Sequence, residues 1–347
     1  MRIAKLGVVG AGTMGSGIAA LAASAGIPVV LLDIPGPEGD RDAPARLGLE
    51  RARKARPAAF MDVNRAGLVT TGNLDDSLQL LADCDLVLEA IVEDVDAKRA
   101  LFAGVEARAR PDAILATNTS SIPLEAIATA LRAPTRLIGL HFFNPVARMM
   151  LVEVVAGRDS DAASVARGAA FVRAIDKLPL PVKSAPGFLV NRVLAPYLMT
   201  AMRCVDEGIA PEAVDEAAVA FGMPMGPIEL ADTVGLDICL AVGRVLDEQG
   251  EPPRTLARHV AAGELGRKTG QGFYAWVNGR ARKQPTPNVP AGLARRLVDP
   301  LVAEARSALA EGIVADADLV DAGAIFGAGF APFRGGPLQY AQSLEAA

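Results

Sequence analysis

The chain opens on a long apolar stretch, from Leu6 to Leu32, that contains no charged side chain. By hydropathy it resembles a membrane span, and Arg2 and Lys5 in front of it imitate a signal peptide. Several glycines and Pro28 interrupt the stretch, however, and divide it into shorter pieces. We predict a strand over 3–9, a helix over about 13–25 and a second strand over 29–32. Because buried parallel strands are continuous apolar runs, this pattern is typical of a first β-α-β unit.

Apolar runs alternate with helical segments as far as about residue 183. The predicted further strands are 86–91, 113–116, 137–140, 151–155 and 180–182, and the predicted helices are 42–66, 94–109 and 123–131. This alternation predicts a parallel sheet. Beyond 184–187 strands disappear and segments rich in Ala and Leu dominate. We therefore predict an α/β Rossmann-type doubly wound domain over 1–183, followed by an all-α region of two related helical units, 184–280 and 285–347.

An internal repeat supports the two helical units. Glu207-Gly208-Ile209 recurs as Glu311-Gly312-Ile313, and the segment 214–218 (VDEAA) recurs as 320–324 (VDAGA). Each copy then runs to a Gly-Pro pair, at 226–227 and at 336–337. The Pro-rich polar segment 278–291 is predicted to link the units. Chance matching in an Ala-rich sequence is the alternative.

Composition narrows the class of protein. With 51% hydrophobic and 22% charged residues among 347, the chain is not intrinsically disordered. A net charge of −5, from 35 basic and 40 acidic side chains, argues against a large nucleic-acid-binding face. The widely spaced Cys84, Cys204 and Cys239 form neither a disulfide framework nor a Cys-rich metal site, and they fit a reducing cytoplasm. With only two histidines, no metal centre is predicted.

Residues 10–15 (GAGTMG) match the dinucleotide-binding fingerprint G-x-G-x-x-G. They follow the first strand and open a helix, and Asp33 ends the next strand. Gly10 allows a tight turn, Gly12 lets the backbone approach a pyrophosphate, and Gly15 lets helix and strand pack closely. Asp33 can accept hydrogen bonds from the adenosine ribose and would repel a 2′-phosphate, which favours NAD over NADP. An ordinary glycine-rich β-α turn is the alternative.

Two residues are candidates for acid–base chemistry. His141 ends an apolar strand, and ligands of open α/β sheets bind at the carboxyl ends of strands. Glu153 lies inside the apolar strand 151–155, where a carboxylate needs a partner. Paired with His141, it would stabilise the imidazolium formed on proton abstraction. A structural histidine and a solvent-facing glutamate are the alternatives.

Short polar side chains supply further candidates. The segment 118–121 (NTSS) follows a predicted strand and can hold a substrate oxygen or a nicotinamide ribose, although Ser120 or Ser121 is alternatively a helix N-cap. Asn191 lies early in the first helix after the boundary, where a plain buried polar contact is equally compatible with its spacing.

Taken together, these motifs resemble the L-3-hydroxyacyl-CoA dehydrogenase family. The matching segments are GAGTMGSGIA (10–19), EAIVED (89–94), NTSSIP (118–123), HFFNPV (141–146), LVEVV (151–155), PGFLVNRVL (186–194), MGPIELAD (225–232) and GRKTGQGFY (266–274). The segment 295–340 resembles the second helical unit of the multifunctional β-oxidation enzymes. Those enzymes also carry an enoyl-CoA hydratase domain. This chain shows none, so hydratase activity is not expected.

The resemblance implies NAD-dependent oxidation of an L-3-hydroxyacyl-CoA to the 3-ketoacyl-CoA, as in fatty-acid β-oxidation. It makes His141 the catalytic base with Glu153 as its partner, and it places Ser120 and Asn191 on the substrate's 3-oxygen. The residues that it places on NAD are Gly10, Gly12, Thr13, Met14, Gly15, Asp33, Glu93, Lys98 and Asn118. The basic helix that carries Arg53, Lys54 and Arg56 lies where related enzymes approach the CoA phosphates.

Two other functions are compatible with the sequence. One is an NAD-dependent dehydrogenase of a small hydroxy acid without CoA, and the other is a non-catalytic cofactor-binding subunit that partners a hydratase or a thiolase. The preferred interpretation is a cytoplasmic enzyme for acyl-CoA thioesters, with no nucleic-acid partner and no membrane span. It is either a homodimer or a monomer in which the helical repeat forms an internal pseudo-dimer.

Overall fold

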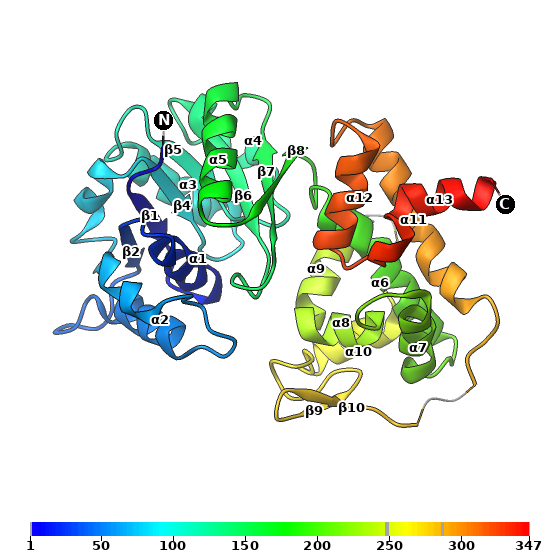
Figure 1. Cartoon of the computed structure of the whole chain (residues 1–347). Helices are drawn as coiled ribbons and strands as arrows, with labels where there is room; N and C mark the ends of the chain where they lie inside the picture. The colour runs from blue at the N-terminus through cyan, green and yellow to red at the C-terminus, as the bar shows by residue number, and fades with distance from the viewer. Residues whose placement is uncertain (1, 247–249, 286–287, 347) are drawn as a thin grey trace. The chain divides into compact units, whose positions relative to one another are not determined.

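The computed structural model describes residues 2–246, 250–285 and 288–346. The chain divides into two compact units, residues 1–185 and 186–347, and each is described by itself (Figure 1). Residues 286 and 287 of the predicted linker lie outside the described residues. Both helical repeats belong to the second unit, and their separation into domains 184–280 and 285–347 remains a prediction.

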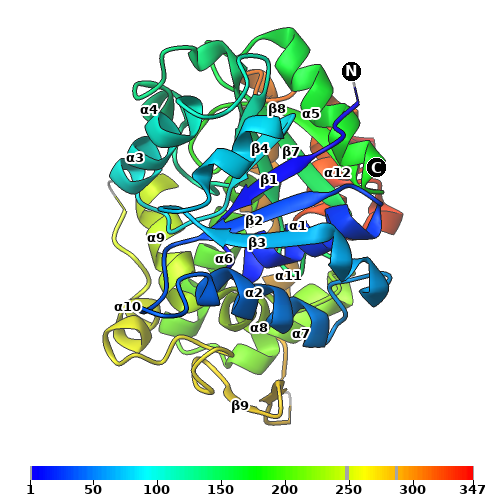
Figure 2. The ribbon, with the colours of Figure 1, turned by 90° about the vertical axis from the view of Figure 1, so that its left-hand side faces the viewer.

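The first unit is built on one sheet with the strand order β3-β2-β1-β4-β5-β6-β7-β8 (Figure 2). The strands are β1 (Leu6–Val9), β2 (Val29–Asp33), β3 (Val69–Asn73), β4 (Leu86–Glu89), β5 (Ile114–Thr117), β6 (Leu137–Phe142), β7 (Leu151–Ala156) and β8 (Leu178–Lys183). Strands β1 to β6 are parallel to one another. Strand β7 is antiparallel to β6 and parallel to β8. The predicted parallel sheet is therefore right for β1–β6 and wrong for β7 and β8.

Helices cover both faces of this sheet, which confirms the doubly wound prediction. The helices are α1 (Thr13–Ser24), α2 (Ala43–Lys54), α3 (Val95–Glu106), α4 (Leu124–Ala128) and α5 (Ala162–Ala174). Alternate residues of each strand enter different cores: Val8 packs with α1, α2 and α5, whereas Val9 packs with α3 and α4. The apolar stretch at the start of the chain is thus β1, α1 and β2. None of the helices in the described part of the chain is both long and apolar enough to cross a membrane.

The predicted helix over 42–66 is wrong beyond its first half. Helix α2 ends at Lys54, and the 3₁₀ helix η1 (Val63–Leu68) leads into strand β3, which the sequence prediction missed. Pro57 explains the early end, because a proline disfavours helical backbone at the residue before it. Strand β3 escaped notice because it carries two threonines, one of them exposed, and so forms no apolar run.

The second unit is helical, as predicted. Its helices are α6 (Val190–Asp206), α7 (Pro211–Phe221), α8 (Pro227–Val234), α9 (Leu236–Leu246), α10 (Arg254–Ala261), α11 (Leu293–Ala310), α12 (Ala317–Phe326) and α13 (Pro337–Glu345). One short antiparallel hairpin, β9 (Ala275–Val277) and β10 (Arg280–Arg282), corrects the expectation that strands disappear. Its turn is Asn278-Gly279, both with positive φ, and Asn-Gly is a known hairpin signal. Residues 278–282 of the predicted linker are therefore part of a hairpin.

The internal repeat has a physical basis in two buried aspartates. Asp215 Oδ1 accepts the Ile228 N–H at 2.8 Å, at the start of α8. Asp321 Oδ1 accepts the Leu338 N–H at 2.7 Å, at the start of α13. Each carboxylate therefore caps the helix that follows its own Gly-Pro pair, and so compensates its burial.

The two long helices of the repeat exchange ion pairs reciprocally. Arg192, near the start of α6, lies 2.6 Å from Glu311, which follows α11. Arg296, near the start of α11, lies 2.5 Å from Glu207, which follows α6. Such an exchange is what a two-fold related pair of elements makes, here within one chain.

We expect Gly226→Ala and Gly336→Ala each to destabilise the second unit by about 1–3 kcal/mol, the usual range for overpacking, and at Gly336 the φ of +108° adds backbone strain. A Cβ atom at 226 would lie 2.2 Å from Asp215 Cγ, and one at 336 would lie 2.3 Å from Asp321 Cβ. Thermal unfolding measures the effect. Gly67→Ala is the control, because no atom lies within 4 Å of its added Cβ. Melting temperatures equal to that of Gly67→Ala would contradict the packing argument.

Candidate active site

His141 and Glu153 lie directly opposite each other on the antiparallel strands β6 and β7. The distance from His141 Nδ1 to Glu153 Oε2 is 2.7 Å, and both side chains are buried. Opposed residues of antiparallel strands project from the same face, which explains why residues so far apart in the chain touch. The predicted contact is therefore present.

This contact assigns the two ring nitrogens of His141. A carboxylate accepts the Nδ1–H, which leaves Nε2 as the basic nitrogen of the neutral ring. Glu153 has no exposed surface, and a buried carboxylate needs hydrogen-bond donors such as this N–H. The arrangement suits a general base.

Asn118 holds the strand end that carries His141. Its Oδ1 accepts the N–H of Phe142, the next residue after His141, at 2.9 Å. Its own N–H donates to the Glu89 carbonyl at 2.8 Å. These bonds tie together the carboxyl ends of β4, β5 and β6, a role for Asn118 that the sequence prediction did not include.

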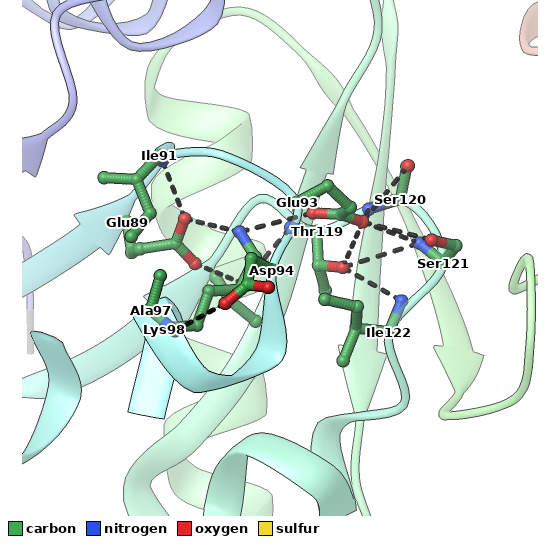
Figure 3. A network of polar contacts seen from close by, with 11 residues as sticks. Glu89, Ile91, Glu93, Asp94, Ala97, Lys98, Thr119, Ser120, Ser121 and Ile122 are labelled. Carbon is green, nitrogen blue, oxygen red and sulfur yellow. Dashed lines mark hydrogen bonds and ion pairs between the residues drawn. The ribbon is translucent and has the colours of Figure 1, made fainter. Parts of the chain in front are cut away.

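The Glu93 carboxylate accepts hydrogen bonds from the loop that follows β5 (Figure 3). Its Oε1 accepts the Thr119 hydroxyl at 2.6 Å, the Ser120 N–H at 2.9 Å and the Ser121 N–H at 3.2 Å. The Ser120 hydroxyl also donates to it at 3.3 Å. Burial by itself would raise the pKa of Glu93, but Lys98, Thr119 and the Ser120 N–H more than offset this and hold that pKa below its usual range. The carboxylate is thus kept ionised beside the loop.

Lys98 lies between two carboxylates. Its Nζ is 2.6 Å from Glu89 Oε1 and 3.3 Å from Glu93 Oε2. Lys98 and Glu89 are each only 1% exposed, whereas the Glu93 side chain is 38% exposed. Lys98 is thus enclosed behind Glu93. Its predicted direct contact with the cofactor remains a prediction.

Neither Ser120 nor Ser121 caps the helix that follows, so that alternative is wrong. The Leu124 N–H at the start of α4 donates instead to the Ser184 hydroxyl at 3.0 Å. Ser184 in turn donates to Glu125 at 2.7 Å. Helix α4 is therefore capped by a residue distant in sequence, and the serines are turned toward Glu93.

The glycine turn has the shape that a dinucleotide diphosphate needs. Gly10 has a φ of +101°, and a Cβ at Gly15 would lie 1.8 Å from the Gly10 carbonyl oxygen, so both positions require glycine. A Cβ at Gly12 would instead meet no atom within 4 Å. That open space lies at the N-terminus of α1, where backbone N–H groups of Thr13, Met14 and Gly15 favour phosphate.

Asp33 stands beside this turn. Its Oδ2 accepts the Ala11 N–H at 2.8 Å, and its Oδ1 accepts the Ile34 N–H at 2.7 Å. The carboxylate is therefore fixed at the end of β2, with acceptor capacity left for ribose hydroxyls. The donor and acceptor groups of the turn and of Asp33 fit NAD.

The basic residues at the end of α2 are exposed. Arg53 pairs with Glu50 at 2.9 Å, Lys54 is 81% exposed, and Arg56 donates to the Ala55 carbonyl. Arg51, a basic residue of the same helix to which the sequence prediction gave no site role, donates from Nη2 to the Ala11 carbonyl at 3.1 Å. Helix α2 thus contacts the glycine turn directly.

Asn191 lies in the second unit, in the first turn of α6, and is half-buried. The other predicted catalytic residues belong to the first unit. Across the described ranges, no cluster of three or more His, Cys, Asp or Glu side chains is suited to a metal ion. Cys84, Cys204 and Cys239 are buried thiols without disulfides.

Glu89 is a residue beside the site that the sequence prediction missed, and Thr119 was considered only as part of the segment 118–121. Glu89 had the same signal as Glu153, a carboxylate inside an apolar strand, and could have been found by it. Thr119 gave no such signal, because its bonds to Glu93 join separate loops.

Comparisons with known proteins match both units of the chain to one family. Residues 5–185 match the family model for the NAD binding domain of 3-hydroxyacyl-CoA dehydrogenase, and residues 187–276 match its C-terminal domain. The chain is 37% identical over 379 residues to the fatty acid oxidation complex subunit alpha of Pseudomonas savastanoi pv. phaseolicola. That alignment covers 99% of this chain and 51% of the relative, so the chain spans about half the length of the curated relatives it matches.

Solved structures give the same picture. FadB2 of Mycobacterium tuberculosis is 41% identical with a TM-score of 0.72, and the match covers 80% of this chain and 100% of that one. The 3-hydroxybutyryl-CoA dehydrogenase of Escherichia coli K12 is 27% identical with a TM-score of 0.84, and the match covers 99% of this chain and 92% of that one.

Proposed function

The chain belongs to the 3-hydroxyacyl-CoA dehydrogenase family, and we propose that it oxidises L-3-hydroxyacyl-CoA thioesters to 3-ketoacyl-CoA with NAD. The observation that carries this proposal is the buried pair of His141 and Glu153 at the carboxyl end of β6. A histidine fixed in this tautomer is a suitable base for a secondary hydroxyl group.

In the proposed reaction His141 Nε2 removes the proton of the 3-hydroxyl group. Glu153, which accepts the Nδ1–H, stabilises the imidazolium that results. When bound, NAD supplies the acceptor for the hydride that leaves C3. The reverse reaction uses the same imidazolium as the acid that protonates the 3-oxygen.

Ser120 and Asn191 are proposed to hydrogen-bond the substrate's 3-oxygen. Groups placed where charge develops are worth most when they are held rigidly. For Ser120 this support comes from the bond that its N–H donates to Glu93, which holds the backbone while the hydroxyl turns to the 3-oxygen. For Asn191 the proposal rests on the family motif in the first turn of α6.

The first experiment is NADH oxidation followed at 340 nm, with acetoacetyl-CoA and with a longer 3-ketoacyl-CoA. Turnover of either supports the proposal, and their ratio begins to define chain length. Oxidation of free hydroxy acids with NAD, without turnover of either thioester, would favour a dehydrogenase without CoA. NADH binding with no turnover of any substrate would favour a non-catalytic subunit. Either of the last two outcomes would reject the proposal.

Replacing Arg53, Lys54 and Arg56 together by alanine is expected to raise KM for acetoacetyl-CoA about tenfold. Exposed ion pairs contribute roughly 0.2–1 kcal/mol each, so three phosphate contacts amount to about one order of magnitude. The control is a truncated acetoacetyl thioester that lacks the nucleotide, whose KM should not change. Equal increases for both thioesters would contradict a phosphate-binding role, as would an unchanged KM for both.

We also propose that the chain is a monomer with an internal pseudo-dimer. The reciprocal ion pairs of Arg192 with Glu311 and of Arg296 with Glu207 support this. Through them, helix α6 is already paired with α11, its counterpart in the repeat of the same chain. Light scattering should give the mass of one 35.9 kDa chain. A dimer mass would reject the proposal.

A reducing cytoplasmic location and hydratase or thiolase partners remain proposals, the former supported by the buried thiols.

A further inference from the structure

Glu89 is a buried acid that the proposed reaction does not use. It ends β4, is 1% exposed, and accepts three hydrogen bonds. The Ile91 N–H and Lys98 Nζ donate to Oε1 at 2.7 and 2.6 Å, and the Thr117 hydroxyl donates to Oε2 at 2.7 Å. Burying a carboxylate and an ammonium group together rarely stabilises a fold more than apolar residues would. The pair therefore calls for an explanation beyond packing.

The ion pair continues outward to the edge of the sheet. Figure 3 shows Glu89, Lys98 and Glu93 in sequence, with Glu93 facing the loop of Thr119, Ser120 and Ser121. Exposure rises along this series, from 1% at Glu89 and Lys98 to 38% at Glu93. Lys98 Nζ contacts both carboxylates and so connects the buried end of this series to the accessible one.

We propose that Glu89 is a positioning residue that acts through Lys98 on Glu93, and so fixes Ser120. With its charge divided between two carboxylates, Lys98 leaves Glu93 Oε1 available to the loop donors. Without the charge at 89, the ammonium group would move onto Glu93 and compete with the Ser120 N–H. The inference rests on the proposed function, because it gives Ser120 and Glu93 their importance.

The test is Glu89→Gln. A glutamine side chain keeps the shape and an acceptor for the Ile91 N–H, and the Thr117 hydroxyl can turn to accept from its amide. We expect kcat for acetoacetyl-CoA reduction to fall about tenfold and the NADH dissociation constant, measured by fluorescence, to rise severalfold. The melting temperature should change no more than in the control.

The matched control is Asp85→Asn, at the residue that directly precedes strand β4. Asp85 is also buried, accepts the Ala4 and Lys5 N–H groups, and lies 2.9 Å from Arg110. Loss of that charge should cost stability but leave kcat and NADH affinity within twofold. If Glu89→Gln behaves in the same way as this control, Glu89 is a structural residue and the proposal is wrong.

A double-mutant cycle tests the route through Lys98. Lys98→Met alone leaves Glu89 buried without a counterion and is at risk of not folding, whereas Glu89→Gln with Lys98→Met buries a neutral pair. If Glu89 acts through Lys98, the double variant should lose no more kcat than whichever single variant folds and loses more kcat. If kcat and NADH affinity in the double variant fall by the product of both single losses, the proposed route is rejected. If Lys98→Met does not fold, the comparison is made with Glu89→Gln alone. The kcat of the double variant must then equal that of Glu89→Gln within threefold.

The NADH titration separates failure of this inference from failure of the proposed function. If the wild-type protein does not reduce acetoacetyl-CoA, the proposed function fails, and the comparison of NADH binding by Glu89→Gln and Asp85→Asn still decides whether Glu89 positions the loop.

Discussion

Replacing His141 by alanine is expected to lower kcat for 3-ketoacyl-CoA reduction by about 10²–10⁴, the usual contribution of a general acid or base. The reason is the contact of 2.7 Å with Glu153, which prepares the ring to exchange a proton at Nε2. Affinity for NADH should survive, because the glycine turn and Asp33 belong to β1, α1 and β2. Stopped-flow reduction and a fluorescence titration measure the two quantities.

The chain supplies its own control in the second histidine. His259 also contacts a glutamate, with Nδ1 2.6 Å from Glu264 Oε2, and is buried in the second unit. It differs in lying in the last turn of helix α10 rather than near the end of a sheet strand. His259→Gln should therefore keep kcat within about twofold. Near-normal turnover in His141→Ala, or an equal loss in His259→Gln, would remove His141 as the base.

Features that depend on neighbouring residues were predictable from the sequence. The glycine turn and Asp33 follow from the order of strand, turn and helix, since that order alone places them at one edge of a sheet. The buried position of Glu153 was also readable, because a lone carboxylate in an apolar strand requires a partner.

Features that depend on pairing between strands were not predictable. The reversed direction of β7, which brings Glu153 opposite His141, is a property of strand register and not of either strand alone. The same holds for Glu93, whose bonds reach Thr119 and Ser120 across the end of β5. The family resemblance pointed to these residues, but the hydrogen bonds between them depend on how the strands pair and where the loops lie.

The second large effect is expected at the glycine turn, where two glycines so close in sequence should respond in opposite ways. Gly12→Val is expected to leave the fold intact and to weaken NADH binding about hundredfold. The Cβ position at Gly12 is open, so the added side chain meets no protein atom within 4 Å and instead fills the space over the α1 N-terminus. A diphosphate pushed away from those N–H groups loses charge-assisted hydrogen bonds worth roughly 1.5–3 kcal/mol each, so the loss of one or two of them is of the order of 10²-fold in affinity.

Gly15→Ala should do the reverse. Its Cβ would lie 1.8 Å from the Gly10 carbonyl oxygen, a backbone atom that cannot yield without moving β1 from α1. We expect destabilisation at or above the upper end of the roughly 1–3 kcal/mol that overpacking costs, with low soluble yield. Melting temperature and NADH titration on both variants separate the two mechanisms. A Gly12→Val protein that melts as early as Gly15→Ala would mean that the space over Gly12 belongs to the fold, and that the diphosphate binds elsewhere.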